Sequence, residues 1–126
     1  QKAIDVDPAN QQMKLVAANA AMDAGLTDKA LLFLATIDDS KITNGDGYFD
    51  LAVGFLRRSD SANAVEYFTK SIAKDPKIVE AYYWRGVAYV QQQKMVEAKA
   101  DMQNVLELDP TGPNGEKAKK ALEQMK

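Results

Sequence analysis

The stretch that decides the fold is AYYWRGVAY, which runs from Ala81 to Tyr89. Four of its residues stand at i, i+3, i+4 and i+7, which is the spacing of one face of an α-helix: Tyr82, Arg85, Gly86 and Tyr89. A second apolar stripe with helical spacing follows at Ala98, Met102 and Val105. We therefore predict two consecutive helices, which approach each other closely where the small residues Gly86 and Ala98 meet.

Asp-Pro pairs mark a regular period along the chain. Pro76 and Pro110 each follow an aspartate and lie 34 residues apart, and Pro8 stands two such steps before Pro76, with Ile42 at the step between. Proline has no N–H donor and disfavours helix in the residue before it, so each pair predicts the end of a helix. A fixed period of this length is typical of repeat architectures. A generic helical bundle, the other interpretation, has no reason to keep such a period.

The residues inside each period resemble the tetratricopeptide repeat (TPR) family, whose signature is an aromatic, a Leu-Gly pair, an aromatic, then Ala, a large apolar residue and Pro. The second unit follows this order with Tyr48, Leu51-Ala52, Phe55, Ala64, Phe68, Ser71 and Pro76. The first unit is degenerate, with Lys14, Ala17-Ala18, Ala21, Gly25, Ala30, Leu34 and Ile37 at these positions. The resemblance implies an all-α fold, a right-handed α-solenoid of helix-turn-helix repeats.

The period also predicts how the chain is divided, as a single TPR domain over residues 1–126. We expect the end of a truncated upstream repeat at 1–10, a degenerate repeat at 11–44, repeats at 45–78 and 79–112, and a capping helix at 113–126. The capping helix is predicted from the apolar stripe of Ala118, Ala121, Leu122 and Met125, because solenoids need an end that is polar on its outer side. On this interpretation the chain is the C-terminal portion of a larger TPR protein, although residues 1–8 could instead be a stray helical tail.

Composition argues against catalysis and against several partner classes. The chain has no Cys and no His, which removes thiolate chemistry, the commonest general base and the commonest metal ligand. Asp38-Asp39 is interpreted as solvated charge, and Asn44-Gly45-Asp46-Gly47 as a turn with a helix N-cap rather than a calcium loop. We therefore predict no enzyme, no cofactor and no metal site.

The charge and hydropathy of the chain are equally plain. The net charge of −2 gives no reason to expect nucleic acid as a partner. No stretch approaches the about 18 apolar residues of a membrane span, so we expect a soluble chain without membrane insertion.

In the TPR family, the first helices of successive repeats line a concave groove in which ligand peptides lie. The family's groove positions correspond to Gln12, Leu15, Asn19, Met22 and Asp23 in the first unit, to Asp46, Phe49, Val53, Leu56 and Arg57 in the second, and to Glu80, Tyr83, Val87, Val90 and Gln91 in the third, with Asp50 and Trp84 beside the floor.

Some TPR domains bind a C-terminal carboxylate through a clamp of Lys, Asn and Arg residues. At the clamp positions this chain has Leu15, Asp50, Glu80 and Trp84, and only Asn19 is kept. The resemblance therefore implies a protein-interaction scaffold that binds a peptide or helix by apolar anchors, with an acidic edge facing a basic flank, and not by a carboxylate clamp. The alternative is a structural or self-association module of a larger parent protein, with a homo-oligomer as one form.

Overall fold

The computed structural model describes residues 8–125, in which the chain forms seven α-helices, one short 3₁₀ helix and no strand. The helices are α1 (Pro8–Asp23), α2 (Thr27–Ala35), η2 (Asp39–Lys41), α3 (Asp46–Arg57), α4 (Ser61–Lys74), α5 (Val79–Gln91), α6 (Met95–Leu108) and α7 (Pro113–Gln124). No helix within these residues is both long enough and apolar enough to cross a membrane.

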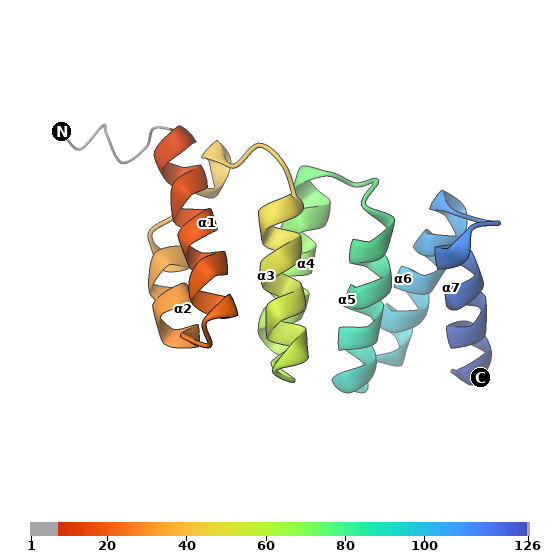
Figure 1. The fold of residues 1–126 in the computed structure, drawn as a ribbon. Helices are drawn as coiled ribbons and strands as arrows, with labels where there is room; N and C mark the ends of the chain where they lie inside the picture. Colours follow the sequence, from red (N-terminus) through yellow and green to blue (C-terminus); the bar gives the residue numbers. More distant parts are fainter. Residues whose placement is uncertain (1–7, 126) are drawn as a thin grey trace.

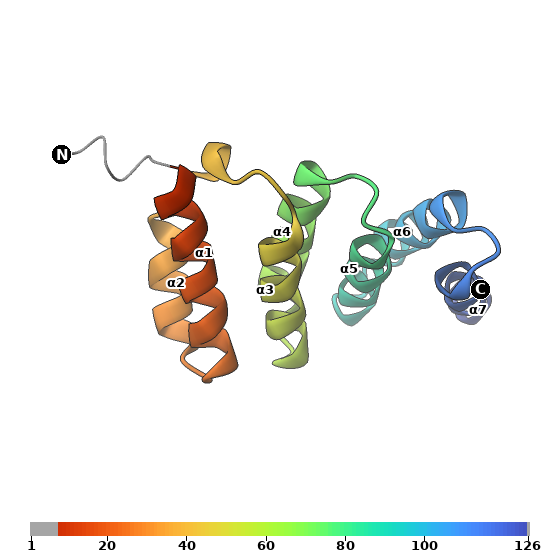
Figure 2. The same cartoon turned by 45° about the horizontal axis from the view of Figure 1, so that its top comes forward.

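The helices form two layers, with α1, α3, α5 and α7 in one and α2, α4 and α6 in the other (Figure 1). Each pair is an antiparallel hairpin that packs on the next pair in chain order, which is the arrangement of an α-solenoid. Seen from the direction of Figure 2, α5, α6 and α7 are viewed closer to end-on than α1 to α4, so the pairs rotate along the array. The all-α solenoid predicted from the sequence is confirmed.

The turn between the two helices of a pair has the same backbone geometry three times. Its central residue has a positive φ at Gly25 (81°), Ser59 (62°) and Gln93 (61°), positions that are 34 residues apart. In each turn the next amide donates to a carbonyl five residues back, for example Leu26 to Ala21 at 2.8 Å. This is the helix C-terminus known as the Schellman motif, and it repeats even in the degenerate first unit.

The interior is built from small and aromatic side chains. Ala52, Ala64 and Ala98 have no exposed surface. A Cβ added to Gly86 would lie 2.8 Å from Cε of Met102 and 3.3 Å from Cβ of Asp101, so the glycine leaves room for α6 to pack closely on α5. Phe55 of α3 stacks on Tyr67 of α4 with ring centroids 5.6 Å apart.

A buried ion pair joins α5 to α6. Arg85 donates to both carboxylate oxygens of Asp101 at 2.9 and 2.7 Å, and its Nη1 reaches Oγ1 of Thr69 on α4 at 3.2 Å. The side chain of Asp101 is 2% exposed. The Arg85 guanidinium also lies 5.8 Å from the ring centroids of both Tyr82 and Tyr89. Arg85 stands where the family signature has leucine, and it connects three helices.

The joint before α7 is held by Asp109. Its carboxylate accepts from the amide of Gly112 at 3.0 Å and from that of Asn114 at 3.2 Å. A Cβ on Gly115 would lie 2.0 Å from the Asp109 carbonyl oxygen, so no other residue fits without movement of the backbone. α7 packs mainly on α6, with Ala118 buried among Met102 and Val105.

The first helix differs in one respect from the predicted boundaries. Residues 1–7 of the truncated upstream repeat lie outside the described residues. Pro8 begins α1, where its missing N–H costs nothing, so residues 8–10 belong to the first helix pair rather than to a preceding helix. The pairs α3–α4 and α5–α6 lie within residues 45–78 and 79–112.

Candidate functional site

Three hollows follow one another across α1, α3, α5 and α7. The central one, between α3 and α5, has a volume of about 440 Å³ and is lined by Phe49, Val53, Leu56, Arg57, Trp84, Val87 and Gln91. A second, of about 530 Å³, lies between α1 and α3 and is lined by Asn19, Asp23, Phe49, Asp50, Val53, Gly54, Arg57 and Arg58. A third, of about 460 Å³, lies between α5, α6 and α7 and is lined by Tyr83, Val87, Val90, Met95, Met102, Ala121, Gln124 and Met125. Because neighbouring hollows share residues, they form one groove.

The floor of the central hollow is apolar, and its two aromatic side chains are held by contacts with other aromatic rings. Phe49 is half-buried, and its ring meets that of Phe68 edge-on with centroids 5.7 Å apart. Trp84 is also half-buried, and it meets Tyr83 edge-on at 5.0 Å. Val53 of α3 and Val87 of α5 line the same hollow. Side chains fixed in this way offer apolar surface without a large loss of rotamer entropy on binding.

Negative charge gathers where the helices of the groove begin. Asp46 and Glu80 lie in the first turns of α3 and α5, where a carboxylate also complements the helix dipole. Burial raises the pKa of the Asp50 carboxyl above its ordinary value, and the negative charges of Asp46 and Asp23 raise it further. A cation placed beside Asp50 would relieve this repulsion.

Twelve of the seventeen predicted groove residues line the hollows: Asn19, Asp23, Phe49, Asp50, Val53, Leu56, Arg57, Tyr83, Trp84, Val87, Val90 and Gln91. Asp46 and Glu80 are exposed beside them. Whether any of these side chains binds a ligand stays a prediction.

The placement of Leu15 and Met22 on the groove surface is wrong. Leu15 is 0% exposed and Met22 is 2% exposed, so neither side chain can meet a ligand. Added Cβ atoms show the reason, because one on Gly47 would lie 2.6 Å from Leu15 and one on Gly54 would lie 3.0 Å from Met22. The two glycines of α3 are seven residues apart, as are Leu15 and Met22 on α1, so the side chains of α1 fill the spaces that the glycines leave.

Asn19, the one clamp residue that is kept, is engaged within the fold. Its Nδ2 donates to the carbonyl of Gly47 at 3.1 Å and to that of Leu15 at 3.3 Å. The amide therefore ties α1 to the start of α3.

Sequence reasoning missed the contribution of α7 and the start of α6. Ala121, Gln124 and Met125 of α7, with Met95 of α6, line the third hollow. From the sequence, the apolar stripe of α7 predicts only a cap. The sequence holds no separate signal for this role, because the same stripe predicts a cap, and only the structure shows that Ala121 and Met125 remain half-buried after α7 packs.

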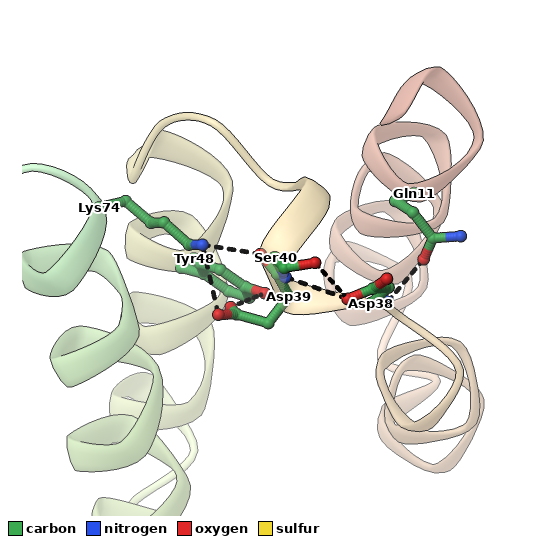
Figure 3. A network of polar contacts seen from close by, with 6 residues as sticks. All are labelled: Gln11, Asp38, Asp39, Ser40, Tyr48 and Lys74. Atoms are coloured by element: carbon green, nitrogen blue, oxygen red, sulfur yellow. Dashed lines mark hydrogen bonds and ion pairs between the residues drawn. The ribbon is translucent and has the colours of Figure 1, made fainter. Parts of the chain in front are cut away.

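The carboxylate pair Asp38-Asp39 is not merely solvated, which corrects its interpretation from the sequence (Figure 3). Asp39 accepts from the Tyr48 hydroxyl at 2.7 Å and pairs with Lys74 at 3.2 Å. The Asp38 amide donates to the side chain of Gln11 at 2.7 Å. Burial alone would raise the pKa of Asp39, but the bonds from Tyr48 and Lys74 outweigh it and hold that pKa below its ordinary value. The network joins α1, η2, α3 and α4, so its role is to hold the first two pairs together.

The fold and the groove define a helical-repeat solenoid with a row of hollows across α1, α3, α5 and α7, and comparison with known proteins identifies the family of repeat. The sequence profile described as "Tetratricopeptide repeat" matches residues 49–113, just over half of the chain. The chain therefore belongs to the tetratricopeptide repeat family.

Curated relatives share only a part of their length with this chain. Aryl-hydrocarbon-interacting protein-like 1 of Saimiri boliviensis boliviensis is 38% identical over 56 residues, which is 44% of this chain and 15% of the relative. The NADPH oxidase activator of Dictyostelium discoideum is 30% identical over 67 residues, which is 53% of this chain and 11% of the relative. The chain thus spans no more than about a seventh of either protein.

Solved structures match over nearly the whole chain. The TPR domain of Arabidopsis OM64 superposes with a TM-score of 0.69 at 27% identity, covering 93% of this chain and 97% of that domain. The first TPR domain of Spaghetti (RPAP3), bound to the HSP90 peptide SRMEEVD, superposes with a TM-score of 0.70 at 26% identity, covering 97% and 94%.

Proposed function

We propose that this chain is a protein-interaction scaffold that binds a peptide or helix of a partner protein through apolar anchors in its concave groove. The observation that carries the proposal is the hollow between α3 and α5, whose floor of Phe49, Val53, Trp84 and Val87 is apolar and open. A solved relative of the same fold holds a peptide, which supports a peptide or protein partner here.

The groove chemistry argues against a carboxylate clamp. Of the positions that would carry the clamp, Leu15 is buried and Trp84 is apolar. Asp50 and Glu80 are acidic, and the pKa of Asp50 is raised first by burial and then by the negative charges of Asp46 and Asp23. An acidic tail such as that of SRMEEVD would add to this repulsion, whereas a basic flank would reduce it.

The experiment uses the intrinsic fluorescence of Trp84, the single tryptophan of the chain. Peptides are selected from a phage-displayed library of random 12-residue sequences against the intact chain, synthesised with amidated C-termini, and titrated alongside SRMEEVD. We expect the selected peptides to share apolar anchors and a lysine or arginine, and to bind without a free carboxylate. Selected peptides that need a free C-terminus, or a library without a binder of Kd below about 1 mM, would contradict the proposal.

A matched pair of variants locates the site. Val53→Asp places a charge on the floor, whereas Val96→Asp places the same charge on α6, where Val96 is 80% exposed. We expect Val53→Asp to weaken binding by about tenfold or more and Val96→Asp to leave it unchanged, because only the first buries a charge under the ligand. Equal effects of the two variants would remove the groove from the binding site.

The alternative, self-association, has one observation in its favour. Met13 and Val16 on α1 are 69% and 62% exposed, and Leu32 on α2 is 70% exposed, so the first pair presents apolar side chains to solvent. Sedimentation velocity over a hundredfold range of concentration separates the two functions. A dimer that Met13→Lys dissociates would favour the alternative, and a monomer throughout would leave the groove as the functional surface.

A further inference from the structure

The third hollow, between α5, α6 and α7, belongs to the same groove, but the function proposed above rests on the central hollow alone. Its floor is Met102, which is 1% exposed, and its rim includes the exposed Met95. It joins the central hollow through Val87, which lines both. One wall is α7, so the helix that caps the solenoid also shapes the groove.

The charge beside this hollow is opposite to that of Asp46 and Asp50 in the first half of α3, although Arg57 near the end of α3 lines the central hollow. Lys117 Nζ lies 5.7 Å from the ring centroid of Tyr83, which lines the hollow. Lys117, Ala121 and Gln124 stand at i, i+4 and i+7 of α7, and the latter two line the hollow, so the lysine belongs to the same helical face. Lys119 points elsewhere, since it pairs with Glu116 at 3.5 Å.

We propose that α7 forms a second anchor subsite and that the groove selects a partner segment with opposite charges at its two ends. One apolar anchor occupies the hollow between α3 and α5, with a basic residue outside it toward Asp46, Asp50 and Glu80. The next anchor occupies the hollow at α7, with an acidic residue outside it toward Lys117. Charge complementarity along the groove identifies this occupant, and the inference rests on the proposed function.

Geometry sets the spacing of the anchors. The two hollows lie on opposite sides of α5, and neighbouring helices pack about 8–10 Å apart. An extended chain covers about 3.3 Å per residue, so the anchors are about three residues apart in the partner segment.

The test uses three synthetic peptides that are acetylated and amidated, each with Phe and Leu three residues apart. One has a lysine outside one anchor and a glutamate outside the other, the second has lysines at both ends, and the third has glutamates at both ends. Because the comparison is between mixed and uniform ends, it does not depend on the direction in which the peptide lies. We expect the mixed peptide to bind about threefold to tenfold more tightly than either uniform peptide.

Charge reversal at α7 provides the decisive arm. In Lys117→Glu the two-lysine peptide should become the tightest ligand, whereas Lys119→Glu, which changes the net charge equally, should keep the order of the intact chain. If the two variants shift all peptides alike, α7 does not read charge and the proposal is overturned, although binding itself would still support the groove as the site. If none of the peptides binds while library-selected peptides do, the anchor spacing is wrong.

A second variant tests the anchor itself. Ala121→Trp fills the third hollow, and circular dichroism at 222 nm checks that the helices are retained. We expect this variant to bind the mixed peptide no better than a matched peptide with the α7-side anchor replaced by glycine. An unchanged preference for the two-anchor peptide would place that anchor elsewhere.

Discussion

Replacing Arg85 by methionine, which keeps an unbranched stem but removes the guanidinium, should expose the cost of a buried, unpaired carboxylate. In Arg85→Met the thioether can still lie between Tyr82 and Tyr89, but Asp101, 2% exposed, loses both of its short bonds. Breaking a buried pair on one side costs about 3–5 kcal/mol. For a chain of this size that corresponds to roughly 10–20 °C in melting temperature, measured by circular dichroism at 222 nm.

The matched double variant isolates the charge from the packing. Arg85→Met with Asp101→Leu removes both charges, and buried pairs replaced by apolar residues are often neutral or stabilising. We expect the free energy of unfolding of the double variant to lie within about 1 kcal/mol of that of the intact chain. A double variant as unstable as the single one would refute the reasoning, because packing rather than charge would then set the stability. A single variant that loses less than about 1 kcal/mol would refute it too, because the unpaired carboxylate would then cost little.

The pH dependence adds an independent readout. Burial already raises the pKa of Asp101, and the bonds from Arg85 oppose that rise. In Arg85→Met the opposition is gone, so the folded-state pKa rises further above the unfolded value. The penalty is then absent below the unfolded pKa of about 3.9 and grows as the pH rises toward the folded-state value. The single variant should therefore recover stability in acid relative to the double variant.

Three further predictions concern the turns, the polar network and the groove. Gly25→Ala should destabilise the fold by about 1 kcal/mol, because φ is +81° at this position, although the added Cβ would meet nothing within 4 Å. Gln93→Gly, at the equivalent position, should not destabilise it. Equal urea midpoints for Gly25→Ala and the intact chain would contradict this. Tyr48→Phe should lower the free energy of unfolding by about 1 kcal/mol at pH 7. This loss should shrink as the pH falls through the lowered pKa of Asp39, because the hydrogen bond stabilises the ionised carboxylate. A loss that stays constant in denaturation experiments from pH 7 to 3 would count against the bond. A lysine-flanked peptide should bind less tightly as the pH falls toward 4. This weakening should begin at a pH above the ordinary aspartate pKa, because the pKa of Asp50 is raised. Asp50→Asn should flatten the pH profile of binding measured by fluorescence titration.

The period of the sequence predicts the solenoid because it depends on one-dimensional information. Spacing along the chain is enough to pair the helices, and the small residues Gly86 and Ala98 mark where they touch. The shared turn geometry could not be predicted in the same way, because its three positions hold Gly25, Ser59 and Gln93, which have no chemistry in common. What they share is a backbone conformation that the surrounding helices impose.

The groove was predicted less completely because its surface depends on pairs of residues that are distant in sequence. Leu15 matches a groove position in the family, yet the missing side chain at Gly47 draws it into the core. Arg85 and Asp101 look like surface charges until α5 and α6 are placed side by side. Reading the groove needs both partners of each contact, and a single sequence shows only one at a time.

The filling of Gly47 and Gly54 by Leu15 and Met22 has a mechanical consequence. Side chains that occupy two spaces seven residues apart oppose sliding or rotation of α1 on α3, so this wall of the groove is rigid. The opposite wall, α7, is joined through the short segment at Gly112 and rests mainly on α6. We therefore expect amide hydrogen exchange to be faster in α7 than in α1. A ligand bound in the groove should slow the exchange of α7 more than that of α1.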